Sequence, residues 1–132
     1  MIGKQKLNLS LKGELAALAY SPDGRMLAAL TNQDDVIIWE TMTGRERARF
    51  PTIRTGYSGR LAFSPDHRYL AAASPMFGDE TLRVWDLATN KQVGPFPGHL
   101  GAVTNVAFSP SGKHLATASS DGTVLIREFG KK

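Results

Sequence analysis

The sequence predicts an all-β fold made of three similar four-stranded units, and two observations predict it. The first is a motif in which Ala, an aromatic residue, Ser and Pro precede a turn and a Leu-Ala pair. Its serines, Ser21, Ser64 and Ser109, are 43 and 45 residues apart, and a period of about 40–45 residues is typical of propellers with four-stranded blades. The second is a succession of short apolar segments between turn residues, without helical periodicity, which is typical of β structure.

The third repeat shows how each unit divides into strands. Pro110 and Gly112 suit the second position and the positive-φ position of a tight turn between two apolar segments. Asp121 and Gly122 lie between the next two segments, and Asp-Gly in such a place is a strong hairpin signal. The predicted strands of this repeat are residues 91–96, 102–108, 114–119 and 123–129. The same pattern predicts strands near Ala48 and at 59–63, 69–73 and 81–86 in the second repeat, and at 6–11, 15–20, 26–30 and 36–40 in the first.

The central strands of the first two repeats are apolar on both sides. Residues 26–30 read Met-Leu-Ala-Ala-Leu, and residues 70–73 read Leu-Ala-Ala-Ala. A strand without polar alternation is covered on both faces, and small alanine side chains allow neighbouring sheets to approach closely. This pattern predicts blades that are stacked face to face.

Charge and composition narrow the classes of function. The chain of 132 residues has a formal net charge of +4 and no cysteine, which excludes disulfides and thiolate metal sites. No apolar run follows the basic N-terminal residues and no stretch has membrane-spanning length, so we expect a cytoplasmic protein. Arg45, Arg47 and Arg49 alternate along a predicted strand and would share one side of it. They indicate a solvated outer strand that resists edge pairing or, as the alternative, a site for phosphate or nucleic acid.

The sequence contains no motif that is typical of an enzyme. It has no glycine-rich phosphate loop, no His-Glu-x-x-His metal motif and no nucleophile elbow. The three histidines, His67, His99 and His114, are far apart in sequence and have no second ligand at metal-binding spacing. We therefore expect a protein without catalytic residues, metal or cofactor.

Several segments of the chain resemble the WD-repeat β-propeller family, and together they cover almost the whole sequence. The resemblance implies four-stranded antiparallel blades and repeats at residues 5–44, 45–90 and 91–129. Each repeat would begin with the outer strand of one blade and continue with the three inner strands of the next. The fold serves many roles, so the resemblance specifies the fold far more closely than the function. The segments that carry it are Gly98-His99, Val106-Ala107-Phe108-Ser109-Pro110, Leu115-Ala116-Thr117-Ala118-Ser119, Asp121-Gly122-Thr123-Val124, Val84-Trp85-Asp86 and Ile38-Trp39-Glu40.

The resemblance also implies a buried polar network in each blade, made of a histidine, a Ser or Thr, a turn aspartate and a tryptophan. No repeat of this chain has all four residues. The third repeat has the first three, but Arg127 replaces the tryptophan. These departures weaken the network, which contributes most when every member is satisfied. The candidate structural residues of the repeats are Trp39, Asp79, Trp85, Asp86, His99, Thr117 and Asp121.

Three blades are too few to close a ring, and the implied strand order leaves both ends of the stack without partner strands. Unpaired edges and uncovered apolar faces favour association. We therefore expect head-to-tail association with copies of the same chain, in which the N-terminal strand of one copy completes the last blade of the next. A homodimer with six blades is favoured over a homotrimer with nine, because propellers have about four to eight blades. The alternatives are a fragment of a longer propeller and a partner that supplies the missing blades.

The expected function is a scaffold that binds protein or peptide partners through loops on one face of the propeller. Residues 74–79 lengthen one turn on that face, where Met76 and Phe77 provide either an adaptable contact or a cover for the neighbouring blade. One alternative is a purely structural or engineered self-assembling unit without a ligand. Another is binding of an anion or nucleic acid through arginines, which we favour less. The candidate binding residues are Gln33, Arg54, Tyr57, Met76, Phe77, His99 and Leu100.

Overall fold

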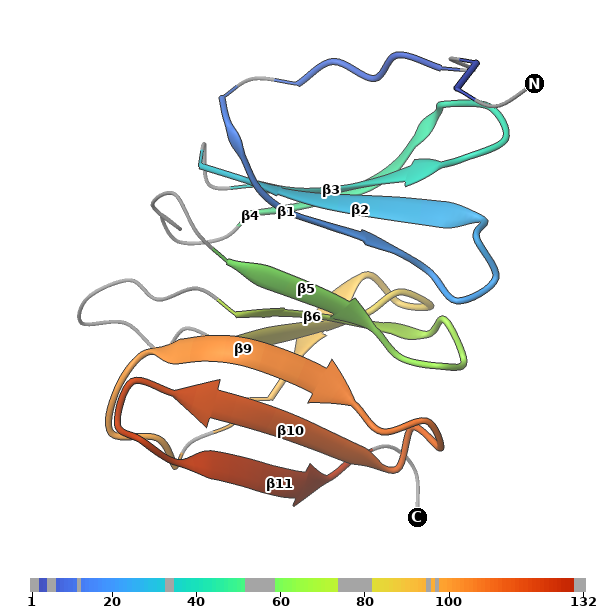
Figure 1. Ribbon diagram of the computed structural model, residues 1–132. Coiled ribbons are helices and arrows are strands. Elements are labelled where there is room, and N and C mark those ends of the chain that lie inside the picture. Colours follow the sequence, from blue (N-terminus) through green and yellow to red (C-terminus); the bar gives the residue numbers. More distant parts are fainter. Residues whose placement is uncertain are drawn as a thin grey trace.

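A computed structural model describes residues 3–4, 7–11, 13–32, 35–51, 59–73, 82–94, 96 and 98–129. The strands of these residues form three antiparallel sheets that are stacked along the chain (Figure 1). No helix in the described part of the chain is long and apolar enough to cross a membrane. We name the sheets blade 1, blade 2 and blade 3 in chain order.

Each blade is a meander in which sequence neighbours pair with one another. Blade 1 contains β1 (Leu15–Tyr20), β2 (Met26–Thr31), β3 (Asp35–Glu40) and β4 (Glu46–Pro51). Blade 2 contains β5 (Arg60–Phe63), β6 (Tyr69–Ala73), β7 (Leu82–Asp86) and β8 (Lys91–Val93). Blade 3 contains β9 (Val103–Phe108), β10 (His114–Ser119) and β11 (Val124–Glu128).

The structure confirms the predicted all-β fold with antiparallel sheets, which have four strands in blades 1 and 2 and, among the described residues, three strands in blade 3. Most strands lie within one residue of their predicted bounds. The predicted strand at 6–11 is wrong for the described residues 7–11, which form no strand. These residues lie over one face of blade 1 rather than beside an edge, so no neighbouring strand provides their hydrogen bonds. The predicted strand at 91–96 ends early, at Val93, because Gly94 adopts a φ of 109°.

The repeated Ser-Pro turns connect the first two strands of every blade. In blade 2, the Ser64 hydroxyl donates to Asp66 Oδ1 at 2.6 Å and accepts the Tyr69 backbone N–H at 2.9 Å. His67 adopts a φ of 65° in this turn, where Gly24 and Gly112 adopt 72° and 75° in the other two. The turn therefore accepts histidine as well as glycine at its left-handed position.

The blades pack against one another in two seams, which contain most of the buried apolar residues. In the first seam, between blades 1 and 2, the rings of Phe50 and Trp85 are stacked with centroids 5.1 Å apart. In the second seam, between blades 2 and 3, Phe129 makes an edge-to-face contact with Tyr69 at 4.9 Å. Buried residues of the first seam include Ala28, Leu30, Val36, Ile38, Leu70 and Ala72, and those of the second include Ala71, Ala73, Val84, Val103, Val106 and Leu115.

The two outward faces of the stack differ. On the face of blade 1 that is turned away from blade 2, Leu9 and Leu11 pack against a buried cluster around Trp39. They leave Leu18 and Tyr20 on the same face 57% and 66% exposed. On blade 3, two residues of β11 that alternate with the seam-facing ones are also open: Val124 is 65% exposed and Ile126 is 72% exposed.

Candidate interaction face

The structure describes only part of the predicted binding surface. Two of the candidate binding residues, His99 and Leu100, lie in the loop between β8 and β9. The other five candidates, Gln33, Arg54, Tyr57, Met76 and Phe77, and the structural candidate Asp79, lie outside the described residues. The site can therefore be built from the loop that carries His99 and from the turn between β10 and β11.

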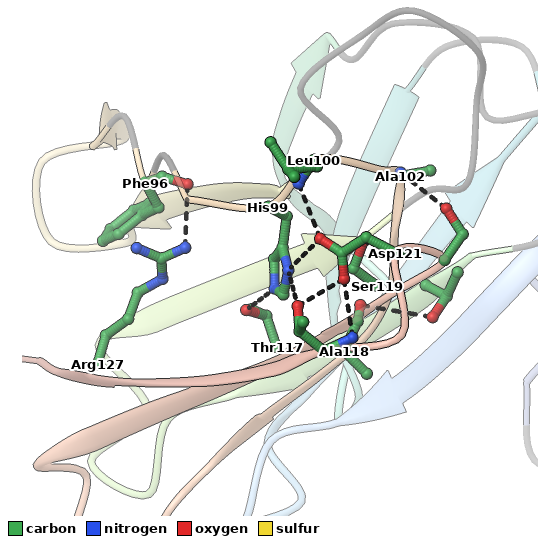
Figure 2. A network of polar contacts seen from close by, with 12 residues as sticks. Phe96, His99, Leu100, Ala102, Thr117, Ala118, Ser119, Asp121 and Arg127 are labelled. Atoms are coloured by element: carbon green, nitrogen blue, oxygen red, sulfur yellow. Dashed lines mark hydrogen bonds and ion pairs between the residues drawn. The ribbon is translucent and has the colours of Figure 1, made fainter.

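The imidazole of His99 links this loop to β10 and to the β10–β11 turn (Figure 2). Its Nε2 lies 2.8 Å from Thr117 Oγ1, and its Nδ1 lies 3.3 Å from Asp121 Oδ2 and 3.1 Å from Thr123 Oγ1. The side chain of His99 is only 3% exposed, and Thr117 is 1% exposed. The ring is therefore enclosed by its partners and presents almost no surface to a ligand.

Asp121 is the acceptor on which the network converges. Its Oδ2 accepts the Leu100 N–H at 2.8 Å, while Oδ1 accepts the Thr123 N–H at 2.8 Å and the Thr123 hydroxyl at 2.5 Å. The Thr123 hydroxyl, with help from these two backbone N–H groups and from His99, holds the pKa of Asp121 well below its usual range, although burial opposes the shift. Because the ionised carboxylate only accepts, His99 Nδ1 donates to it.

Leu100 projects from this fixed loop into solvent. Its side chain is 96% exposed, while its backbone N–H is held by Asp121. Gly101 explains the close approach of the loop to the turn, because a Cβ at this position would lie 2.5 Å from Ser120 Oγ and 3.0 Å from the Asp121 nitrogen. The Ser120 hydroxyl in turn accepts the Ala102 N–H at 3.1 Å. The result is an apolar side chain displayed on a backbone with little freedom.

Arg127 occupies the place of the missing tryptophan. It pairs with Leu115 across β10 and β11, as Trp85 pairs with Leu70 and Trp39 with Leu27. Its Nη2 donates to the Phe96 carbonyl at 3.3 Å (Figure 2), while its buried Nε has no hydrogen-bond partner among the described residues. The third repeat thus joins three of the four network residues and uses the guanidinium to hold the preceding segment.

The other candidate structural residues lie in or beside the blade cores. Trp85 is 2% exposed and belongs to the first seam, whereas Trp39 is 6% exposed and lies under residues 9 and 11. Asp86 accepts two hydrogen bonds from Arg68, at 3.2 and 3.0 Å. The Arg68 guanidinium holds the pKa of Asp86 below its usual value.

The predicted row of arginines is not present in the structure. Arg45 precedes β4, and the strand contains a register shift opposite Ile38 and Trp39. Arg49 forms ion pairs with Glu46 at 2.8 Å and Asp35 at 3.1 Å, while Arg47 contacts the sulfur of Met26. The local bulge disrupts the simple alternation, and the charge of Arg49 is already balanced.

Sequence reasoning missed the residues that tie the loop to the turn. Ser120 contacts the Ala102 N–H and Thr123 contacts the His99 ring across this junction. Within the turn, the Ser119 hydroxyl accepts the Asp121 N–H at 3.1 Å. The signal was present in the Ser-Ser-Asp-Gly-Thr run, because such side chains readily bond to nearby backbone. Among the residues that the structure describes, no group of three or more His, Cys, Asp and Glu side chains could hold a metal ion.

Comparison with known proteins gives relatives that share this fold and part of this sequence. Target of rapamycin complex subunit wat1 of Schizosaccharomyces pombe is 36% identical over 115 residues, which cover 83% of this chain. Pre-mRNA-processing factor 19 homolog 2 of Arabidopsis thaliana is 34% identical over 109 residues, which cover 82% of this chain. The chain spans 34% and 19% of the length of these two relatives.

A solved structure shares the fold of this chain, and a family model matches its sequence. The crystal structure of the RRP9 WD40 repeats superposes with a TM-score of 0.78 at 21% identity, over 90% of this chain and 36% of that one, which shows the shared fold. The model of the family described as WD domain, G-beta repeat matches residues 55–86 and 90–127. These matches cover more than half of the sequence, and the chain belongs to the WD-repeat family.

Proposed function

We propose that this chain is a non-catalytic propeller scaffold that binds protein or peptide partners through the loops beside His99. The observation that carries the proposal is Leu100, which is 96% exposed on a loop whose backbone is fixed by Asp121. A pre-ordered contact loses little conformational entropy on binding. The relative wat1, named as a complex subunit, supports a role in protein assembly. The proposal places the protein in the cytoplasm, with which a chain without cysteine is compatible.

In this proposal His99 supports the surface and Leu100 contacts the partner. The remaining predicted binding residues would extend the contact, because the WD-repeat resemblance assigns their loops to the same face. A random dodecapeptide phage library selected against the wild-type chain tests this. Peptides selected in this way should lose binding to Leu100→Asp, because the new charge would be buried at the contact.

Met42→Asp is the matched control for this experiment. Met42 is 87% exposed in the turn between β3 and β4. This turn lies beside the Ser-Pro turn of blade 1, because the N–H of Thr41 donates to the carbonyl of Arg25 in that turn. Binding should be unchanged in this variant. Peptides that bind both variants equally, or an absence of selected peptides, would contradict the proposed contact surface.

We further propose that a second copy of this chain completes the ring of blades, which gives six blades in a homodimer, with a nine-bladed homotrimer as the second choice. Its support is the pair of open apolar faces, with Leu18 and Tyr20 on blade 1 and Val124 and Ile126 on blade 3. Leu7 precedes Ser21 by the same 14 residues that separate Phe50 from Ser64. Residues 3–8 thus hold the position in the repeat that β4 holds in the next, and in this proposal the N-terminal segment would pair with β11 of the other copy.

The mass in solution, measured by light scattering on a sizing column, tests this assembly. We expect two times the chain mass of 14.3 kDa, and three times this mass would indicate the nine-bladed ring. A stable monomer would contradict self-assembly and would indicate that the open faces are covered by other blades. Deletion of residues 1–12 should abolish the assembly, because it removes the strand that is exchanged.

A further inference from the structure

Residues 7–11 form a strap over the outward face of blade 1 (Figure 1). Leu9 and Leu11 are half-buried and pack against the cluster around Trp39. No residue of the strap forms a hydrogen bond with another described residue, so the apolar contacts of these two leucines hold it in place. A segment with so few contacts opens at a low cost in free energy.

The face under the strap is the counterpart of the face of blade 2 that receives blade 1. Trp39 pairs with Leu27 across two strands of blade 1, as Trp85 pairs with Leu70 in blade 2. Trp85 and Leu70 are buried in the first seam. The strap therefore lies where, one repeat later, a whole blade lies.

The strap covers only part of this face. Tyr20 directly precedes Ser21 as Phe63 directly precedes Ser64. Phe63 is 8% exposed in the first seam, whereas Tyr20 is 66% exposed beside the strap. A blade in the place of the strap would also bury Tyr20, so the face offers more apolar surface to a blade than the strap uses.

The outward face of blade 3 carries the matching surface. Ile126 pairs with the alanine that follows Ser109 by seven residues, as Ile38 pairs with the alanine that follows Ser21 by seven residues. Ile38 is fully buried in the first seam, whereas Ile126 is 72% exposed. Blade 3 thus presents the same residue as the blade 1 surface that fills the first seam, and a second copy of this chain is the partner that fits both outward faces.

The strap and such a partner exclude one another. A docked blade would take the space above Trp39 in which Leu9 and Leu11 now lie. The strap also overlaps residues 3–8, which hold the position of β4 in the repeat. Pairing of these residues with β11 of another copy would draw the strap away from its present position.

We propose that the strap is an autoinhibitory element that controls self-assembly. Packed over Trp39, it blocks the docking face of blade 1 and withholds residues 3–8 from strand exchange. Its release opens the face and frees the strand in one step. This inference rests on the self-assembly proposed above and adds the element that regulates it.

The double variant Leu9→Ser/Leu11→Ser releases the strap without changing the strand that is exchanged, because both residues follow residues 3–8. Sedimentation equilibrium of the full chain over a range of concentrations gives the dissociation constant of the assembly. We expect the variant to assemble more tightly than the wild type, by about tenfold or more, because it loses apolar contacts that only the strapped single copy makes.

Ser10→Ala is the matched control for the double variant. Ser10 lies in the strap between the two leucines, and its side chain is exposed. The change leaves the packing of the strap on blade 1 intact, so the dissociation constant should equal that of the wild type. A shift in this control as large as in the double variant would show that the leucine contacts are not the cause.

Trp39 reports the position of the strap independently of mass. The chain has two tryptophans, so Trp39 is the only fluorophore of this kind in a Trp85→Phe background. At concentrations where the chain is a single copy, acrylamide should quench Trp39 more strongly in the double variant than in Ser10→Ala. As copies assemble at higher concentration, quenching in the double variant should fall again, because a blade takes the place of the strap.

The outcomes separate this inference from the self-assembly on which it rests. Equal dissociation constants for the double variant and the wild type would overturn the inference and leave self-assembly in place. Weaker assembly of the double variant would also overturn it, since the leucines would then stabilise the assembly. If every protein stays a single copy, self-assembly and its regulation both fail, and stronger quenching in the double variant would show the strap to be only a cover. Unchanged quenching would contradict the strap itself.

Discussion

The two seams of this molecule use the same backbone frame with different side chains. The first is closed by the Phe50–Trp85 stack and by the His67–Asp23 contact. The second has Arg127 in place of a tryptophan and Gly112 in place of the bridging histidine, and it contains a cavity. Strand pairing and the Ser-Pro turns are alike in both. The comparison teaches that strand pairing and turns define the blades, while the side chains at the seams determine whether the space between two blades is filled or open.

The largest loss of stability is expected from Trp85→Ala, because this change removes a buried ring from the first seam. Trp85 is 2% exposed and stacks on Phe50, and truncation of a buried large aromatic residue costs about 3–5 kcal/mol. Urea unfolding followed by circular dichroism gives the free energy of unfolding. A loss below about 1 kcal/mol would show that this stack contributes little to stability.

A smaller loss of stability, measured for matched leucine variants, compares the packing of the two seams directly. Leu70 and Leu115 are both fully buried and hold equivalent places opposite Trp85 and Arg127. Each change to alanine should cost about 2–5 kcal/mol, with the lower value for Leu115, because the second seam has space into which its walls can relax. Paired urea titrations of the two variants measure the difference. A larger loss for Leu115→Ala would show that the second seam is the tighter one.

The polar network of the third repeat should make the stability of the folded chain depend on pH. The pKa of Asp121 is lowered in the folded chain, so its stabilising contribution is complete above the ordinary aspartate pKa, near 3.8. This contribution to stability is lost as the pH falls from about 3.8 through the lowered pKa of Asp121 in the folded chain. Melting temperatures of the wild type should therefore fall more steeply below about pH 4 than those of Asp121→Asn. Parallel slopes for the two proteins would contradict this assignment.

The smallest effect is expected from His67→Gly, which gives the first seam the turn of the second. The variant loses a partly exposed contact with Asp23 but relieves a non-glycine residue of its positive φ. Since such contacts contribute little, the melting temperature should shift by only a few degrees. A large loss would show that the bridge, and not the Phe50–Trp85 stack, closes this seam.

The repeat in the sequence predicted most of the fold, because residues with equivalents in other repeats share their structure. It placed the strands of the blades and aligned Arg127 with the tryptophans, which the register confirms. The prediction of a strand was wrong for residues 7–11, which have the alternating pattern of a strand but no neighbouring strand among the described residues. The prediction that the three arginines share one side of a strand was wrong, because an alternating sequence pattern does not reveal a bulge in the strand pairing.

The candidate site was only partly predictable. His99, Thr117 and Asp121 were expected to act together, and the structure brings them into one network. The cavity was not predicted, because the repeat pattern does not show how completely the side chains fill the space between two blades. Gly112 in place of His67 looks like an ordinary turn glycine, and the loss of the contact that His67 makes with Asp23 appears only when the two seams are compared across the blades.

The segment that covers Trp39 makes the two ends of the stack unequal. Leu9 and Leu11 already lie on the outward face of blade 1, whereas Val124 and Ile126 of blade 3 have no such cover. In the assembly proposed above, a blade of another copy could dock on blade 3 directly, but on blade 1 it would first have to displace residues 7–11 of the same chain. The two ends would then differ in how readily they accept a further blade.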